Sequence, residues 1–509
     1  MRSKKAFYNI LTNLLLQIVS ITYGFIVPKI IIDCFGSDVN GLVVSITQFL
    51  GYIALLESGF GPVVKAVLYK PIAKRDNITI ARILKTSERF FRRITMVFLV
   101  YIAVLCVVFP FITRADFDAA FTISLVLVIS IGTFAEYFFG MTYRILLQAE
   151  QKTYVVSVIQ ITTYIIAISF VVLLALLNVD VVFIKLATGL VFLLRPIAQN
   201  LYVRKKYNIK LQNTLSDYPI KQKWDGLAQH IAAVVRGNTD IVVLTIFSTL
   251  SEVSVYSVYA LVLSAIKKIV QSFNADMDSL FGDMLARNEV ENLRKKFSAY
   301  ELLYMILITV LFACTLILIT PFVQNYTSGV HDADYARPLF GCLLTLSEFV
   351  WAIRLPYNSL TLAAGHFKET RKGAWFEAII NVVVSIVLVF NFGIVGVAIG
   401  TLVAMAIRTV EFVYHANKYI LKRGTRTSVG KILLAVFIAS VAITIYAFVP
   451  MNFSHGYFEW GIGALIAFLV VSTLTILLYT MFYRKEMRGV IKWLEGKAKR
   501  FRTHYKKYE

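Results

Sequence analysis

Apolar runs of about 20 residues recur along the whole chain, and this pattern restricts the fold more than any other feature. Each run is long enough to cross the hydrocarbon core of a bilayer as one α-helix. The runs are continuous, whereas strands of a membrane barrel alternate apolar and polar residues. Only 16% of the 509 residues are charged, compared with about 25% in soluble proteins. The sequence therefore predicts an all-α, polytopic membrane protein.

The distribution of Lys and Arg predicts how the chain is threaded through the membrane. The apolar runs correspond to about fourteen spans. Positive charge concentrates in alternate loops, for example residues 70–93, 204–223 and 365–372. Since cytoplasmic loops carry the excess of Lys and Arg, both termini are predicted to lie in the cytoplasm. The net charge of +22 is thereby explained without a nucleic-acid partner.

The second half of the chain repeats features of the first half. Positions about 212 residues apart carry the same residue and align span with span. The matching pairs include Phe35 and Phe247, Pro110 and Pro321, Glu136 and Glu348, and Arg195 and Arg408. Six helices repeated in one orientation predict two six-helix lobes related by a pseudo-twofold axis along the membrane normal. Two C-terminal helices lie outside this repeat.

The repeat and the loops predict the domain organisation. The predicted parts are an N-lobe at 1–203, a cytoplasmic linker at 204–225, a C-lobe at 226–420, two final spans at 431–483 and a basic tail at 484–509. The tail is either an interfacial helix on an anionic membrane surface or a solvated basic segment.

Charged residues inside the spans are the candidates for function. The stretch 226–247 carries Arg236 and Asp240 near its middle, and each such charge costs about 2.5–3.5 kcal/mol to insert into lipid. The two residues are spaced i, i+4, so they either neutralise each other or line a hydrated cavity. Arginine binds phosphate oxygens in a bidentate geometry, which predicts an anion-binding cavity. The residues predicted to line it are Arg236, Arg354, Arg408, Arg195, Arg144, Lys65 and Lys267. For Arg144 and one of the adjacent Lys267 and Lys268, the alternative is snorkelling to the interface.

Acidic and polar residues inside the spans form a second candidate set. Glu377 and Asn381 are again i, i+4, and together with Asp240 and Thr401 they offer oxygen ligands to Na⁺ or a carboxylate to a proton. Three further acids are predicted to be buried, namely Glu57, Glu136 and Glu348. The alternative role of all these carboxylates is to neutralise the arginines. The expected driving force is an ion gradient, with no cofactor and no firm metal site.

Enzyme motifs are not supported. The segment GTRTSVGK, residues 424–431, departs from the phosphate-binding loop in its glycine spacing and in the residue that follows Lys431. The pair Asp332 and Asp334 resembles the acidic pair of a metal-dependent sugar transferase, but solvated loop carboxylates of this kind are far more common. The chain is therefore predicted not to be an enzyme.

One stretch resembles the start of a known family. The residues FGSDVNGLVVSITQFLGYIALLESGFGPVVKAVLYKPIAKRD, and within them Gly36, Gly41, Glu57 and Gly61, are similar to those of Wzx-type polysaccharide flippases. These flippases belong to the multidrug/oligosaccharidyl-lipid/polysaccharide superfamily, with the MATE exporters and the lipid II flippases. The predicted fourteen spans and the six-plus-six repeat also resemble that family.

The resemblance implies a function. It implies transfer of undecaprenyl-pyrophosphate-linked oligosaccharides between the leaflets of the bacterial cytoplasmic membrane, for synthesis of cell-surface polysaccharide. It also implies a cationic central cavity and, from the lipid II flippases, a sodium site between helices seven, eleven and twelve. The expected partners are the lipid-linked oligosaccharide, membrane lipids and a polysaccharide polymerase, and the expected state is a monomer. A MATE-like multidrug exporter and a membrane glycosyltransferase are the alternatives.

Overall fold

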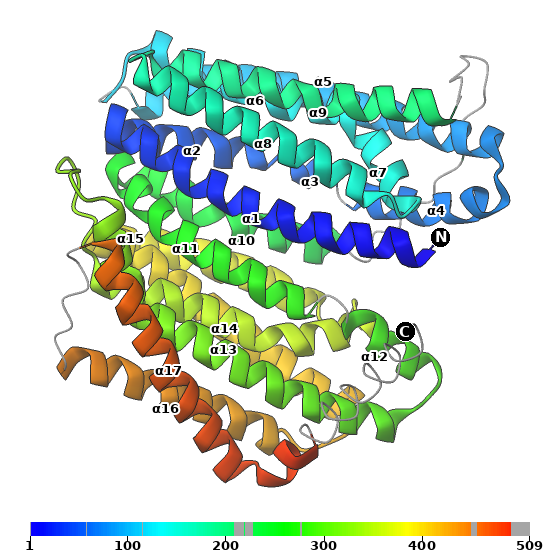
Figure 1. Cartoon of the computed structure of the whole chain (residues 1–509), viewed down its shortest axis with the longest axis vertical. Coiled ribbons are helices and arrows are strands. Elements are labelled where there is room, and N and C mark those ends of the chain that lie inside the picture. The colour runs from blue at the N-terminus through cyan, green and yellow to red at the C-terminus, as the bar shows by residue number, and fades with distance from the viewer. Residues whose placement is uncertain are drawn as a thin grey trace, which may run out of the picture. The chain divides into compact units, whose positions relative to one another are not determined.

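The computed structural model describes residues 2–57, 59–113, 116–207, 218, 227–274, 277–448 and 456–489 (Figure 1). Within these ranges the regular secondary structure is entirely helical, which confirms the predicted all-α class. Most of the predicted linker at 204–225, the tail beyond residue 489 and the side chain of Arg236 lie outside the described residues.

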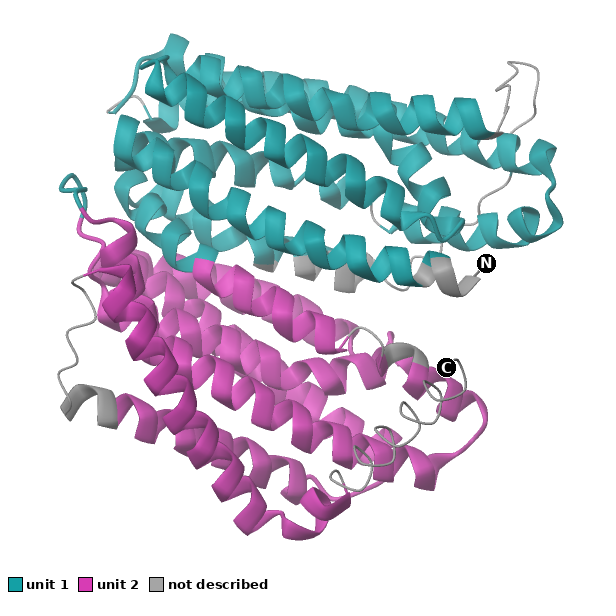
Figure 2. Cartoon of the chain, viewed as in Figure 1, with its two compact units in different colours: residues 1–261, 329–333 teal, residues 262–328, 334–509 magenta. Residues whose placement is uncertain are grey.

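The chain forms two compact units (Figure 2). Unit 1 comprises Met1–Leu261 and Gly329–Ala333, and unit 2 comprises Val262–Ser328 and Asp334–Glu509. The helices of unit 1 are α1 (Arg2–Phe35), α2 (Ser37–Gly51), α3 (Ala54–Glu57), α4 (Phe60–Lys74), α5 (Asn77–Thr113), α6 (Ala119–Ala135), the π-helix η1 (Glu136–Gly140), α7 (Met141–Ala149), α8 (Thr153–Leu176), α9 (Val181–Tyr207) and α10 (Leu227–Phe247).

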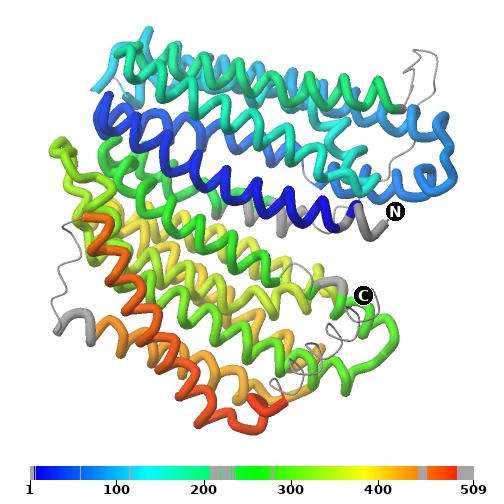
Figure 3. Tube along the Cα trace, viewed as in Figure 1, coloured from blue at the N-terminus to red at the C-terminus, as the bar shows by residue number. Residues whose placement is uncertain are grey.

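Helix α11 (Leu250–Asn274) begins in unit 1 and ends in unit 2. The other helices of unit 2 are α12 (Met277–Ala286), α13 (Val290–Tyr326), α14 (Pro338–Ala363), α15 (Arg371–His415), the π-helix η3 (Ala416–Ile420), α16 (Arg426–Phe448) and α17 (Tyr457–Phe482). Figure 3 traces this order from blue at α1 to red at α17. The predicted lobe boundaries, 1–203 and 226–420, remain predictions.

The helices account for the predicted number of spans. Twelve of the described helical segments are long and apolar enough to cross a membrane. Helix α10 has 21 residues, although the described apolar part, Gly237–Phe247, is shorter. Helix α15 has 45 residues, about 67 Å of helix, which is twice the hydrocarbon thickness. It turns back at Gly393, whose φ of 53° is accessible to glycine, and so supplies two spans.

The two halves of α15 lie side by side. Asn381 Nδ2 donates to Thr401 Oγ1 at 2.9 Å, and Ser385 Oγ donates to the carbonyl of Val397 at 3.4 Å. Gly400 allows this approach, because a Cβ built there would lie 2.3 Å from Ser385 Oγ. The hairpin therefore brings charged residues from both halves of α15 onto one surface.

Helix lengths support the internal repeat. Helices α5 and α13 both have 37 residues, and their first residues, Asn77 and Val290, are 213 positions apart. Each contains a proline close to its C-terminal end, Pro110 and Pro321. The same sequence pattern thus folds into the same long helix in each half of the chain.

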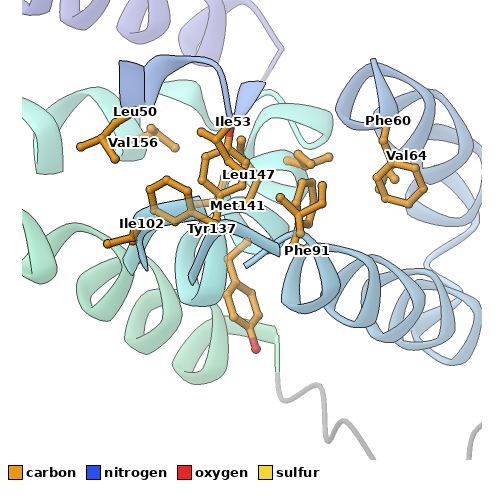
Figure 4. Close-up of a cluster of buried hydrophobic side chains, with 14 of the residues drawn as sticks. Leu50, Ile53, Phe60, Val64, Phe91, Ile102, Tyr137, Met141, Leu147 and Val156 are labelled. Carbon is orange, nitrogen blue, oxygen red and sulfur yellow. The ribbon is translucent and has the colours of Figure 1, made fainter. Parts of the chain in front are cut away.

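A hydrophobic cluster holds the helices of unit 1 together. Ile53, Phe60 of α4, Phe91 of α5, Tyr137 of η1 and Met141 of α7 are all buried in it (Figure 4). Within a membrane such side chains stabilise helix packing mainly through close van der Waals contacts, because lipid tails are as apolar as the side chains themselves. The cluster fixes the broken helix α6–η1–α7 against α5, and η1 carries the predicted site residue Glu136.

Candidate substrate and coupling site

Three charged residues predicted from the sequence form one cluster with Glu411 inside unit 2, which we call the Arg–Glu cluster. It comprises Arg354 of α14 and Glu377, Arg408 and Glu411 of α15. Arg354 Nη1 donates to Glu377 Oε1 at 2.7 Å, and Arg408 Nε lies 3.5 Å from Glu377 Oε2. Arg408 Nη1 donates to Glu411 as well. The side chains of Arg354, Glu377 and Arg408 are 5%, 6% and 1% exposed, whereas that of Glu411 is 31% exposed.

Local sequence explains how the cluster assembles. The hairpin at Gly393 places Arg408 opposite Glu377, and the small residue Gly373 leaves room for the guanidinium of Arg408. Arg408 Nη1 also donates to the carbonyl of Thr370 at 2.9 Å, and its guanidinium lies 4.2 Å from the ring centre of Phe412. Buried charges are tolerated when they are paired and hydrogen-bonded, and this cluster, with two cations and two anions, is formally neutral.

The residues predicted to bind a coupling cation are only partly brought together. Glu377, Asn381 and Thr401 are buried in unit 2, where Glu377 and Asn381 lie one turn apart on the first half of α15 and Asn381 donates to Thr401 on the second half. Asp240 belongs to unit 1, where it accepts a hydrogen bond from the hydroxyl of Tyr256 at 2.8 Å. Both oxygens of Glu377 contact arginines, so in this structure the carboxylate has no uncompensated charge for Na⁺.

Arg195 occupies the position in unit 1 that corresponds to Arg408 in the repeat. Its Nε donates to Thr163 Oγ1 at 2.8 Å, and its guanidinium lies 4.5 Å and 3.9 Å from the ring centres of Tyr164 and Phe192. Its Nη2 is buried and has no hydrogen-bond partner among the described residues. The two repeats have therefore diverged, since Arg408 faces carboxylates and Arg195 faces aromatic rings.

The remaining predicted cations differ in their surroundings. Arg144 is paired with Glu136, and Lys267 donates to Glu348 at 2.8 Å. Lys65 on α4 is half-buried. The backbone of Arg236 lies in α10, but its side chain is outside the described residues. These cations lie in both units, and the structure does not show them in one common cavity.

The three acids predicted to be buried are instead half-buried. Glu57, Glu136 and Glu348 all retain accessible surface, and the side chain of Glu136 is 37% exposed. The physical reason is that Glu136 and Glu348 reach toward long basic side chains, which remain partly accessible themselves. The alternative role, neutralising a cation, fits Glu136 and Glu348.

Sequence reasoning missed a second buried ionic group in unit 2, the Glu301 cluster. Glu301 of α13 accepts hydrogen bonds from Arg423 Nη2, Lys431 Nζ, Ser428 Oγ and the hydroxyl of Tyr357, at 2.6–2.9 Å. Glu301 and Lys431 are completely buried. The sequence does show an acid in the apolar run of α13, but the two cations that pair with it, Arg423 and Lys431, lie more than a hundred positions further along the chain. Lys431, the lysine of the GTRTSVGK segment, thus binds a carboxylate of its own chain.

The two aspartates of the loop between α13 and α14 accept hydrogen bonds from backbone N–H groups. Asp332 accepts hydrogen bonds from the backbone N–H and the hydroxyl of Ser37, both at 2.6 Å, at the N-terminus of α2. Asp334 accepts from the backbone N–H of Ala336 at 2.9 Å. Such carboxylates cap helices and turns. Among the described residues no group of three or more potential metal ligands occurs.

Capping and sugar-transfer chemistry predict different mutational results. We expect Asp332→Ala to lower the free energy of unfolding by about 1–2 kcal/mol, because the substitution removes a helix cap. Asp334→Ala should change it little. Unfolding of purified variants in detergent measures this difference. If both substitutions left stability unchanged but abolished function equally, the acidic pair would be catalytic.

Polar contacts join α2 to α10 and α11 within unit 1. Asn40 Nδ2 donates to Ser254 Oγ at 2.8 Å, and the hydroxyls of Ser45 and Thr245 lie 2.7 Å apart. Between them Gly41 lies against the backbone of Leu250, where a Cβ on residue 41 would be 1.9 Å from the carbonyl oxygen. Helices from both sequence repeats therefore pack closely at this point.

Comparison with known proteins gives structural matches only. No family model and no curated protein matches the sequence. The lipid II flippase MurJ in an inward closed conformation is similar with a TM-score of 0.66 and 12% identity, over 94% of this chain and 99% of that chain. An inward-facing MATE family multidrug resistance transporter gives a TM-score of 0.57 and 15% identity, over 82% of this chain and 99% of that chain. A eukaryotic MATE transporter gives a TM-score of 0.53 and 15% identity, over 87% of this chain and 98% of that chain.

These matches span nearly the full length of the solved proteins. At identities of 12–15% such a likeness establishes the fold. It agrees with the fold that the resemblance of residues 35–76 implied. The chain therefore has the same all-α membrane fold as these solved flippase and transporter structures.

Proposed function

We propose that the protein is a transporter that flips polyprenyl-pyrophosphate-linked oligosaccharides from the cytoplasmic to the outer leaflet of a bacterial cytoplasmic membrane. The observation that carries the proposal is the fold shared with a lipid II flippase over 94% of the chain. The charge of the chain supports it, because the spans contain many arginines and lysines, whereas an exporter of organic cations would favour an acidic or apolar cavity. The protein is not an enzyme in this proposal, and its neighbours in structure are flippases and transporters.

The proposed mechanism is alternating access. Arginines bind the pyrophosphate, with Arg236, Arg354 and Arg408 as the first candidates, because a guanidinium donates in parallel to two phosphate oxygens. The sugars cross in a hydrated cleft, and the prenyl chain stays in lipid. The proposed partners are the lipid-linked oligosaccharide, surrounding lipids and a polysaccharide polymerase, with the protein acting as a monomer.

Depletion of the protein in its native cell tests this function. We expect completed lipid-linked repeat units to accumulate, since synthesis on the cytoplasmic side continues while transfer stops. Mass analysis of extracted prenyl-linked oligosaccharides measures the accumulation, and re-expression of the wild-type protein should reverse it.

The same experiment separates the alternatives. An unchanged lipid pool combined with sensitivity to toxic organic cations would favour a multidrug exporter, for which the MATE-like fold is the supporting observation. A truncated lipid-linked glycan would indicate a glycosyltransferase. Either result would contradict the flippase proposal.

A further inference from the structure

We propose that the Arg–Glu cluster is an exchange site, in which a phosphate-type anion replaces Glu377 between Arg354 and Arg408 while Glu377 takes up a proton from solution. This inference rests on the proposed function, because it assigns the coupling step to the site that would receive the pyrophosphate. In this proposal Glu377 couples anion binding to proton uptake and does not serve as a Na⁺ ligand.

The first argument is geometric. Glu377 presents one oxygen to each arginine, 2.7 Å from Arg354 Nη1 and 3.5 Å from Arg408 Nε. Two guanidinium groups that converge on two oxygens of one small anion are a suitable receptor for tetrahedral oxyanions, because phosphate oxygens accept the same paired N–H donors as a carboxylate. The carboxylate of Glu377 therefore occupies the position that a phosphate group would require.

The second argument is charge balance. The Arg–Glu cluster contains two guanidinium and two carboxylate groups, and three of the four side chains are at least 94% buried. Adding an anion to this neutral group would leave net negative charge in a medium of low dielectric constant, which is costly. Protonation of Glu377 to the neutral acid removes one negative charge. One proton bound with each anion leaves the cluster neutral when a monoanion enters, and leaves one net negative charge in place of two when a dianion such as sulfate enters.

The other ionisable groups of the surrounding helices have partners of their own. On α14, Glu348 contacts Lys267, and the hydroxyl of Tyr357 contacts Glu301. On η3, Lys418 contacts the hydroxyl of Tyr414. At the end of α15, His415 contacts His366 at 2.9 Å. Glu377 forms ion pairs with Arg354 and Arg408, and Glu411 contacts Arg408 as well.

The cluster also has a side from which an anion could approach. Glu411 is the partly exposed member, and Gly373, close to both Glu411 and Arg408, lies in the first turn of α15. The exposed cations of the adjacent segment are Lys368, Arg371 and Lys372. Such a group of exposed positive charges raises the local concentration of anions. An entering anion would meet Glu411 and Arg408 first and Glu377 last.

The experiment uses the full-length protein purified in detergent, with sulfate as the probe. Sulfate is a tetrahedral dianion that does not titrate near neutral pH. Any proton taken up when it binds is therefore bound by the protein and not by the sulfate. Calorimetric titration in two buffers of different ionisation enthalpy gives the number of protons. We expect about one proton per sulfate, and an affinity that falls up to about tenfold for each pH unit of increase where uptake is complete.

Two matched variants assign the proton. Glu377→Gln imitates the protonated acid, so this variant should bind sulfate without proton uptake and with an affinity that is independent of pH. Glu369→Gln removes an exposed carboxylate outside the cluster and should retain both the uptake and the pH dependence. Thermal unfolding of each variant checks that it is folded, and the pH dependence of the wild-type protein is informative without either variant.

Several results would overturn the inference. They are the absence of sulfate binding to the wild-type protein, binding without proton uptake, uptake that persists in Glu377→Gln, and uptake that is also lost in Glu369→Gln. The flippase proposal is tested independently, because the lipid pool of depleted cells is measured without sulfate binding. Accumulated lipid-linked repeat units together with proton-independent anion binding would retain the function and reject the exchange site.

Discussion

Replacement of Glu301 with leucine is expected to lower the free energy of unfolding by about 3 kcal/mol and to reduce the yield of folded protein. The substitution leaves Lys431, which is completely buried, and Arg423, which is 12% exposed, without the carboxylate that both contact. Removing one partner of a buried ion pair costs about 3–5 kcal/mol, because the remaining charge stays desolvated. Lys431 retains Glu486 at 2.6 Å, so the loss is expected at the lower end of that range. A loss of this size is a large part of the total stability of a typical domain.

The measurement is the yield and thermal unfolding of the variant in detergent, followed by size-exclusion chromatography. Glu291→Leu is the control, since Glu291 lies on the same helix and its side chain is 72% exposed. Combining Glu301→Gln with Lys431→Met should restore part of the stability, because the variant removes both a buried anion and a buried cation. Normal yield and unfolding of Glu301→Leu would show that the Glu301 cluster is not required for folding.

Replacement of Gly41 with valine is expected to separate α2 from the start of α11. The nearest neighbours of a Cβ at position 41 are backbone atoms of Leu250, with the carbonyl oxygen at 1.9 Å and the carbonyl carbon at 2.6 Å. Backbone atoms cannot rotate away as a flexible side chain can, so the helices must shift by more than 1 Å. Overpacking of this kind costs about 1–3 kcal/mol or more, and here it also removes the hydrogen bond between Asn40 and Ser254.

Thermal unfolding again measures the effect, and the chain provides a suitable control. Gly237 lies in α10, and a Cβ built there has no neighbour within 4 Å. Gly237→Ala is therefore expected to be neutral or to stabilise α10 by up to about 1 kcal/mol. Equal unfolding temperatures for Gly41→Val and Gly237→Ala would contradict the close packing of α2 against Leu250.

The fold could be predicted from the sequence because its determinants are periodic and local. Apolar runs report each span, and the equal lengths of α5 and α13 agree with an internal repeat of about 212 residues. The bend within α15 was also visible, because Asn391 and Gly393 interrupt an apolar run that is too long for one crossing. The exact ends of the helices could be predicted less well, because they depend on contacts between segments that are distant in the sequence.

The candidate site could be predicted only as a set of charged residues. The sequence places the charged residues Arg354, Glu377 and Arg408 inside apolar runs, but it does not show which of them form ion pairs. The pairing depends on the α15 hairpin and on the packing of α14 against it, which are tertiary features. For the same reason, Glu301 was overlooked, because Lys431 is 130 residues away and contacts it only in the folded state.

The buried contact between Glu301 and Lys431 also limits how this architecture can change during evolution. Helices α16 and α17 lie outside the repeat, so a gene could lose or gain them as one terminal block. The carboxylate on α13 is compensated by Lys431 of α16 and by Arg423 just before α16, so loss of this terminal part of the chain would remove both cations. A descendant that lost the terminal block would therefore be selected to replace the acid at position 301 with an apolar residue. Conversely, an acid at this position of α13 should be inherited together with the two additional helices.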